Sequence, residues 1–302
     1  MRIVSLLPSA TELVAELGLR ASLVGVSHEC DTPPDVAELP RLTASTIGHD
    51  LGQEEIDAAV SRAVREGLPL YAVDGPALAA LQPDLIVTQG LCDVCAVTER
   101  TITHALQLLP DGLLEGVPTL SLDGVSWEGV LADLRRLGDA TGRGAEARAR
   151  VQEARARWDA VVKRRLLAPR RGLAFLEWVE PPFFGGHWVP EQIAAAGGLD
   201  VLGDGEGPSG RVSPEAVAEA NPDVLVVGCC GFDLAANLAH AAAVRAHPVL
   251  GALRAVAEGR LWAVDANACF SRPSLRLARG VELLAHILED GADLPGEAAR
   301  VP

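Results

Sequence analysis

Cysteines are the residues of this chain whose types and spacing most directly suggest chemistry. Cys92 and Cys95 stand in a Cys-x-x-Cys pair, and Cys229 and Cys230 are adjacent. The first spacing suits a metal ligand pair or a redox pair, but a zinc site needs a second pair of similar spacing, which adjacent cysteines do not supply. Small buried thiols are the third interpretation. In a chain of 302 residues, six such cysteines do not resemble a secreted disulfide framework.

Two polar segments near the N-terminus could also contact a ligand. His28, Glu29 and Cys30 follow a short apolar run, and with Cys92 they could hold a metal, although an ordinary hydrogen-bonded loop is the alternative. Further upstream, the pattern Ser9-Ala10-Thr11-Glu12 predicts a capping box with Ser9 as N-cap. The N–H groups of such a helix start could hold an anionic group.

The densest aromatic cluster lies in the second half of the chain. Only 4% of the residues are aromatic, so each large ring is a candidate for a specific contact. Such rings supply a large apolar contact area to a bulky, partly apolar ligand. The cluster consists of Trp178, Phe183, Phe184, His187 and Trp188.

Common enzyme signatures are absent from the sequence. There is no Walker loop, no G-x-S-x-G elbow, no H-E-x-x-H and no G-x-G-x-x-G after an apolar run. No pair of carboxylates stands out as an acid–base couple. These absences count against the common enzyme classes, though not against every enzyme.

Charge and hydropathy narrow the class of partner. The net charge of −15 argues against nucleic acid or an anionic membrane as a main partner. No run of 18 apolar residues occurs, so we expect no membrane insertion. The first residues do not read as a signal peptide, which predicts a cytoplasmic protein. A start further upstream would instead allow a periplasmic or membrane-associated location.

The elements that must position these residues alternate between strand and helix. This alternation predicts an α/β fold with mainly parallel sheets. We expect strands at residues 2–6, 23–26, 69–73, 84–88, 119–122, 172–178, 223–228 and 260–264. We expect helices at 9–17, 53–66, 76–81, 98–109, 126–140, 274–288 and from about 190, 233 and 250, with a loose tail from Gly291.

One long charged helix, residues 142–167, divides the chain. Its narrow apolar stripe at three- and four-residue steps is typical of a strut between domains. The halves before and after it share phrases in the same order, for example Gln82-Pro83-Asp84-Leu85 and Asn221-Pro222-Asp223-Val224, which suggests a duplicated lobe. We therefore predict an N-terminal lobe at 1–141, a connecting helix at 142–168 and a C-terminal lobe at 169–302.

Several polar or aromatic loops follow predicted strands in both halves. In open α/β sheets, ligands bind at the carboxyl ends of the strands. Two lobes held by a strut would bring these loops together across a cleft, a usual place for a small-molecule site.

The order of these segments resembles the helical-backbone substrate-binding proteins of ABC importers over nearly the whole chain. The resemblance rests on the segments beginning at Leu7-Pro8-Ser9-Ala10-Thr11-Glu12, Leu23-Val24-Gly25 and Pro83-Asp84-Leu85, on the long helix, and on Pro222-Asp223-Val224. Among these proteins it is most similar to vitamin B12-binding and iron-siderophore- or haem-binding members. The quoted segments closest to the B12-binding branch are Ser27–Asp31, Cys92–Val97 and Phe175–Trp178.

The resemblance implies two Rossmann-like lobes joined by one rigid helix, with a ligand held between them and an ABC permease as partner if the protein is exported. It implies no required cofactor, because a cobalamin-like corrinoid would be the ligand itself. The ligand contacts that we expect are Ser9, Ala10, Thr11, His28, Glu29, Cys30, Gln89, Cys92, Trp178, Phe183, Phe184, Trp188, Cys229, Cys230, Phe270 and Arg272.

Three hypotheses follow for the function. The leading one is non-catalytic binding of a corrinoid, with an iron-siderophore or haem as the alternative ligand. The second is a thiol-dependent enzyme that uses Cys92 and Cys95 on a small metabolite. The third is a metal-binding protein that uses His28, Cys30 and Cys92.

Overall fold

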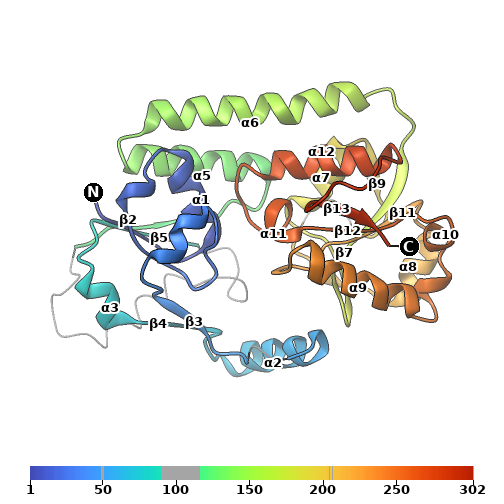
Figure 1. Cartoon of the computed structure of the whole chain (residues 1–302), viewed down its shortest axis with the longest axis horizontal. Coiled ribbons are helices and arrows are strands. Elements are labelled where there is room, and N and C mark those ends of the chain that lie inside the picture. The colour runs from blue at the N-terminus through green and yellow to red at the C-terminus, as the bar shows by residue number, and fades with distance from the viewer. Residues whose placement is uncertain (49–50, 90–115, 204, 206, 302) are drawn as a thin grey trace. The chain divides into compact units, whose positions relative to one another are not determined.

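The computed structural model describes residues 1–48, 51–89, 116–203, 205 and 207–301. The chain forms two compact units, Met1–Gln152 and Glu153–Pro302, each with its own sheet and helices (Figure 1). Among the described residues, no helix is both long and apolar enough to cross a bilayer. The predicted helix at 98–109 lies outside the described residues.

The first unit is built on a parallel sheet of order β2-β1-β5-β6. Its strands are β1 (Ile3–Ser5), β2 (Leu23–Val26), β5 (Leu85–Thr88) and β6 (Thr119–Ser121). Every residue of β1 and β5 is buried, as expected for a parallel sheet covered on both faces. The predicted parallel α/β architecture is therefore confirmed in this unit.

Helices cover the two faces of this sheet. On one face, α1 (Pro8–Glu16) packs against β1, β2 and α5 (Trp127–Ala140). On the other, Val4 and Ile86 form a small core with Leu42 and with Leu78 of α3 (Gly75–Ala80). The side chains of Asp74 and Ser126 cap α3 and α5 by accepting backbone N–H bonds.

The predicted capping box at Ser9 is wrong. Pro8 occupies the first helical position, where a missing N–H costs nothing, so α1 begins one residue earlier than expected. Leu7 is the N-cap and gives no side-chain cap. Ser9 and Glu12 consequently lie inside the helix, and both are buried.

The predicted strand at 69–73 does not join the parallel sheet. It forms β4 (Tyr71–Val73), which pairs antiparallel with the unpredicted β3 (Thr43–Ser45) as a separate ribbon. The helix α2 (Gln53–Glu66) matches its predicted bounds and ends at Gly67, whose φ of +66° is the left-handed conformation that glycine adopts most easily. Short 3₁₀ turns occur at η1 (Arg20–Ser22) and η2 (Pro34–Glu38).

The second unit has a larger mixed sheet of order β10-β8-β7-β11-β12-β13, with β9 also paired to β7. Its parallel strands are β7 (Arg171–Val179), β9 (Gly198–Asp200), β11 (Val224–Val227) and β12 (Leu261–Val264). Antiparallel strands β8 (Pro182–Phe184), β10 (Gly210–Arg211) and β13 (Ala298–Arg300) extend it at both sides.

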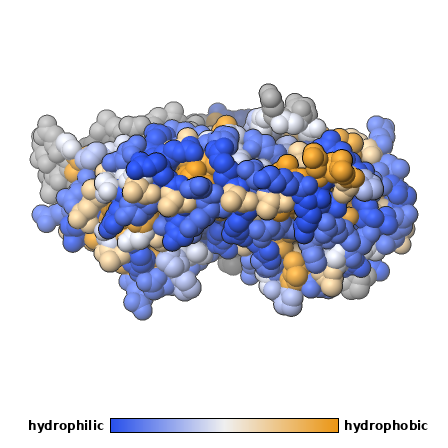
Figure 2. Space-filling model, turned by 90° about the horizontal axis from the view of Figure 1, so that it is seen from above, coloured by the Kyte–Doolittle hydropathy of each residue, from blue (hydrophilic) through white to orange (hydrophobic). Residues whose placement is uncertain are grey.

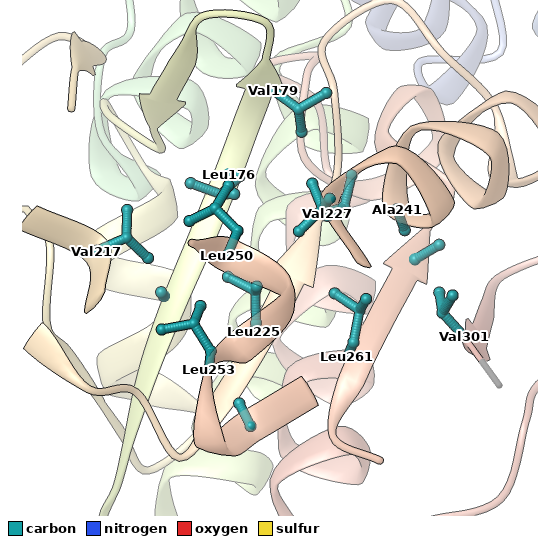
Figure 3. Close-up of a cluster of buried hydrophobic side chains, with 14 of the residues drawn as sticks. Leu176, Val179, Val217, Leu225, Val227, Ala241, Leu250, Leu253, Leu261 and Val301 are labelled. Carbon is teal, nitrogen blue, oxygen red and sulfur yellow. The ribbon is translucent and has the colours of Figure 1, made fainter. Parts of the chain in front are cut away.

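Figure 3 shows the core on one face of this sheet. Leu176, Leu225 and Leu261 from three neighbouring strands pack against Val217 of α8 (Pro214–Ala220) and Ala241 of α9 (Leu234–Ala246). The turn η3 (Leu250–Ala252) and α10 (Arg254–Ala257) complete this layer. The predicted helix from about 250 is therefore these two short pieces.

The other face of the sheet is covered by α7 (Val189–Ala195) and α12 (Leu277–Leu288), which pack against each other (Figure 1). The short α11 (Ala266–Cys269) leads from β12 towards α12. The loose tail predicted from Gly291 is wrong: β13 pairs with β12, Val301 is buried, and Arg279 forms a two-bond ion pair with Glu297. Edge pairing stabilises an Ala-rich segment that has little strand propensity of its own.

The two units share one strand order, which the repeated phrases did not specify. The order β2-β1-β5-β6 in the first unit matches β9-β7-β11-β12 in the second, with all these pairs parallel. The repeated Pro-Asp phrase also has the same contact in both. Asp84 accepts a hydrogen bond from the backbone N–H of Arg2 (2.6 Å), and Asp223 accepts one from Gly172 (2.8 Å).

The predicted long helix is confirmed as α6 (Gly144–Arg165), and the boundary between the units falls within it. Its predicted apolar stripe is the buried one: Ala147, Val151, Ala154, Trp158 and Val161 are all buried. Arg165 continues the stripe and bonds to the carbonyl of Ala196 and to Glu289.

Candidate ligand-binding site

In the first unit, the predicted contacts gather after the carboxyl ends of β1, β2 and β5. Thr11 donates a hydrogen bond to Ser5 Oγ (2.8 Å), and Cys30 Sγ lies 3.1 Å from the same threonine hydroxyl. All three side chains are buried, as are Ser9, Ala10 and Gln89. This group therefore forms a closed hydroxyl–thiol network that positions the loops around it.

His28 is the partly exposed polar group at the edge of this network. Thr43 Oγ1 lies 2.7 Å from His28 Nδ1, accepts the backbone N–H of His28 and donates its own proton to Ser27 Oγ. The Thr43 hydroxyl therefore anchors both the backbone and the ring of His28. An imidazole held in this way is a group that a metal centre or a polar ligand can use.

Neighbouring side chains define the surroundings of this imidazole. The ring of Tyr71 is tilted against it at 6.0 Å, and the exposed Glu29 carboxylate lies 4.0 Å from Nε2. Arg41 donates to the carbonyls of Ser27 and Cys30 and so holds the loop. The loop thus presents one imidazole and one carboxylate on a fixed backbone.

In the second unit, the predicted aromatic cluster divides into two groups. Trp178 and Phe183 are half-buried and lie opposite each other across the β7–β8 hairpin. Phe232 packs against Trp178 with ring centroids 5.8 Å apart, and the Arg211 guanidinium lies 5.5 Å from the Phe183 ring. Together they form an aromatic surface at the carboxyl ends of β7 and β11 that keeps part of each ring accessible.

Trp188 and Phe270 form the other group and are buried. Trp188 donates its indole N–H to the carbonyl of Phe270, and the Phe270 ring packs on Phe175 at 5.0 Å. Gln192 reinforces this link by donating to the carbonyls of Cys269 (3.0 Å) and Leu277 (2.9 Å). These residues fix the loop between α11 and α12, which carries the partly exposed Arg272.

Phe184 belongs with neither group. It is half-buried, and its ring covers Gly210 so closely that a Cβ there would lie 2.7 Å from it. Gly210 therefore allows β10 to pair with β8, and Phe184 mainly seals that contact.

The described cysteines differ in exposure. Cys30, Cys229 and Cys269 are buried, and Cys230 is exposed. Burial raises the pKa of Cys269 to about 12, so its thiol stays protonated at neutral pH. Cys92 and Cys95 lie outside the described residues, and so does most of the predicted loop at 89–95. Within the described part of the chain, no three His, Cys, Asp or Glu side chains are grouped to hold a metal.

Two further residues contribute to this region. Phe232 completes the aromatic surface by packing against Trp178. His187 has a φ of +56°, a strained backbone for a non-glycine residue, and its N–H donates to the carbonyl of Gly207. Burial lowers its pKa, so the imidazole beside Trp188 is neutral at neutral pH.

A groove of about 450 Å³ lies elsewhere in the second unit, between α6 and α12. Its charged walls are already paired: Arg157 makes two bonds to Glu282, and Arg279 bonds to Glu282 and Glu297. None of the predicted ligand contacts lines it.

Comparisons with known proteins bear on this arrangement. A family model described as a periplasmic binding protein matches residues 3–268. A search of curated proteins finds no significant match.

Solved structures share the fold over nearly the whole chain. A periplasmic vitamin B12-binding protein of Vibrio cholerae is 22% identical, with a TM-score of 0.68 and 96% of each chain covered. A periplasmic haem-binding protein of the same organism is 19% identical, with a TM-score of 0.71 over 95% of this chain and 98% of that one. A possible iron-binding protein of Staphylococcus epidermidis is 20% identical, with a TM-score of 0.70 and the same coverage.

At these identities the structural likeness establishes the fold, and the family model covers most of the sequence. The chain belongs to the periplasmic binding protein family.

Proposed function

We propose that this protein is a substrate-binding protein of an ABC importer that carries a corrinoid-like ligand without catalysis. The observation that carries the proposal is the aromatic surface of Trp178, Phe183 and Phe232. Trp178 and Phe232 pack against the core yet remain partly exposed, so contact with a ligand costs little conformational entropy. A large, flat, partly apolar ligand uses such a surface best.

The first unit supports the proposal through His28. The Thr43 contact fixes this partly exposed ring beside the Glu29 carboxylate, and an imidazole is a group that a metal-centred ligand or a polar ligand group can contact. A corrinoid offers both a metal centre and side-chain amides for such a contact.

Haem or a ferric siderophore is the second candidate ligand. The same aromatic surface and the same imidazole suit an iron-centred planar ligand, and relatives of equal structural likeness are haem-binding proteins. Titration with each ligand separates the candidates. Saturable binding of cobalamin, with weak or no binding of haem and ferric siderophore, supports the leading proposal, and the reverse order rejects it.

The thiol-dependent alternative places the chemistry at Cys92 and Cys95. The double variant Cys92→Ser/Cys95→Ser tests it directly, because ligand binding should survive in this variant if the protein is a carrier. Loss of all measurable function on replacement of these two thiols would favour the alternative.

Cellular location is a separate proposal. The expectation of a cytoplasmic protein stays a prediction, and transport by a permease partner requires export. Fractionation of cells that express the full-length tagged protein decides between the two locations.

A further inference from the structure

The end of α6 carries an apolar surface that the binding function does not use. Leu166 is 74% exposed and Leu167 is 95% exposed, and Val162, one helical turn before Leu166, is 37% exposed. These three residues, which we call the leucine tip, face away from the buried stripe of Val161 and Arg165. A further exposed apolar side chain, Leu199, lies on β9, which pairs with the start of β7.

The tip lies within the most basic segment of an acidic chain. Residues 143–171 hold ten of the 26 basic residues but only three of the 41 acidic ones, so the segment has a net charge of +7 in a protein of −15. This end of α6 can therefore attract an anionic surface, although the chain as a whole is acidic. Figure 2 looks onto the α6 side and shows an apolar area near its right-hand end among hydrophilic atoms.

The charges around the tip are only partly neutralised. Glu289 pairs with Arg165 and lies near Arg164, while Asp290 pairs with Arg171 and Arg260. Within the described part of the chain, the exposed Lys163 and Arg170 pair with no carboxylate. Lys163 and Arg170 thus leave unpaired positive charge next to the leucines in the chain, and Arg164, 3.9 Å from Glu289, adds a long ion pair to this positive rim.

An ordinary helix end explains the cations but not the leucines. Basic residues in the last turn stabilise a helix by interacting with its carbonyl end. Two adjacent leucines this exposed bury nothing within the unit, so they contribute nothing to its core. Exposed leucines with a rim of lysine and arginine are suited to the headgroup region of an anionic bilayer, where apolar side chains insert and cations meet lipid phosphates.

We propose that the leucine tip, with its rim of Lys163, Arg164 and Arg170, docks reversibly on an anionic lipid surface. Transfer of a leucine side chain from water to an apolar medium changes an equilibrium constant by about tenfold or more. The contact is therefore weak enough to be reversible and strong enough to measure.

Co-sedimentation of the full chain with vesicles tests the proposal. The probes are phosphatidylcholine vesicles with and without phosphatidylglycerol. We expect binding to the mixed vesicles, weaker binding at high salt, and little binding to phosphatidylcholine alone. The variant Leu166→Ser/Leu167→Ser should have an affinity for the mixed vesicles that is lower by about tenfold or more. The variant Lys163→Gln/Arg170→Gln should lose most of the preference for vesicles that contain phosphatidylglycerol.

Val64 and Leu68 provide a matched control, because they are 55% and 54% exposed in the first unit. The variant Val64→Ser/Leu68→Ser should bind the vesicles as the wild type does. All variants should keep their far-ultraviolet circular dichroism and ligand affinity, which separates a failure of this proposal from a failure of the proposed ligand.

Two outcomes overturn the proposal. One is equal vesicle binding by the wild type and the Leu166→Ser/Leu167→Ser variant, or no binding by either. The other is concentration-dependent self-association of the wild type, lost in that variant and without vesicle binding, because the tip would then be an interface between copies.

Discussion

Asp223 accepts a hydrogen bond from the backbone N–H of Gly172 at the start of the central strand β7, as Asp84 does from Arg2 just before the central strand β1. The two aspartates occupy the same place in the repeated Pro-Asp phrase. Each ties the strand that it precedes to the strand at the centre of its sheet. The Pro-Asp phrase that recurs in the sequence therefore makes the same hydrogen bond in both units.

Asp223 should make the free energy of unfolding depend on pH in the acid range. Its hydrogen bond from the Arg254 side chain, with that from Gly172, holds the pKa of the Asp223 carboxyl below its usual range. A lowered folded pKa contributes stability above the unfolded value of 3.8, and this contribution is lost as the pH falls through the folded pKa.

Replacing Asp223 by Asn should therefore destabilise the protein by about 1 kcal/mol at neutral pH and by less below pH ~3. Urea unfolding at several pH values measures both. An Asn variant with the full wild-type pH dependence between pH ~5 and ~2 would show that other carboxyl groups are responsible.

Truncation of Trp178 should mainly lower ligand affinity, whereas truncation of Trp188 should mainly lower the stability of the protein. Trp178→Ala removes half-exposed aromatic surface and should weaken ligand binding by about 1–3 kcal/mol with a small change in stability. Trp188→Ala removes a buried ring and its bond to Phe270, and should lower stability by about 3–5 kcal/mol. Urea unfolding and ligand titration on both variants give the comparison. Equal affinity loss without destabilisation in Trp188→Ala would show that Trp188 contacts the ligand itself.

Gln192 should be a positioning residue for the loop that carries Arg272. The change Gln192→Met keeps the volume but removes both donated bonds, leaving the carbonyls of Cys269 and Leu277 without them. We expect a loss of about 1–3 kcal/mol in unfolding free energy. The exposed Gln152 on α6 gives the control: Gln152→Met should change stability by less than about 0.5 kcal/mol. A purely structural role would leave the ligand affinity of the folded Gln192→Met variant unchanged, whereas positioning predicts a weaker affinity.

Thiol reactivity should single out Cys230. In a Cys92→Ser/Cys95→Ser background, four cysteines remain, of which only Cys230 is exposed. One thiol should react with a disulfide reagent in the native protein at neutral pH, and all four should react after denaturation. The additional change Cys230→Ser should abolish the native reaction. Fast reaction of a second thiol would contradict the closed packing of Cys30, Cys229 and Cys269.

The features with long periodic patterns could be predicted from the sequence. The buried stripe of α6, the bounds of α2 and the mainly parallel strands follow from apolar spacing and from the alternation of strands and helices. Short antiparallel strands such as β3, β8, β10 and β13 could not be predicted, because pairing with a neighbouring strand, rather than their own residues, makes them strands.

The site was harder to predict for a related reason. Trp178 and Trp188 lie in the same aromatic run, yet one ring is partly accessible and the other is enclosed. That difference depends on Phe270, which is 82 residues further along the chain from Trp188. Local sequence cannot show such a contact. The predicted ligand contacts remain predictions, now sorted into those with accessible surface and those that support them.

Titration of the purified protein with cyanocobalamin, followed by tryptophan fluorescence, would show whether it binds a corrinoid. Haem and a ferric siderophore serve as comparisons, and the Trp178→Ala variant reports whether the aromatic surface takes part. We expect saturable quenching by cobalamin, reduced in Trp178→Ala. Absence of saturable binding, or tighter binding of haem or siderophore, would contradict this expectation.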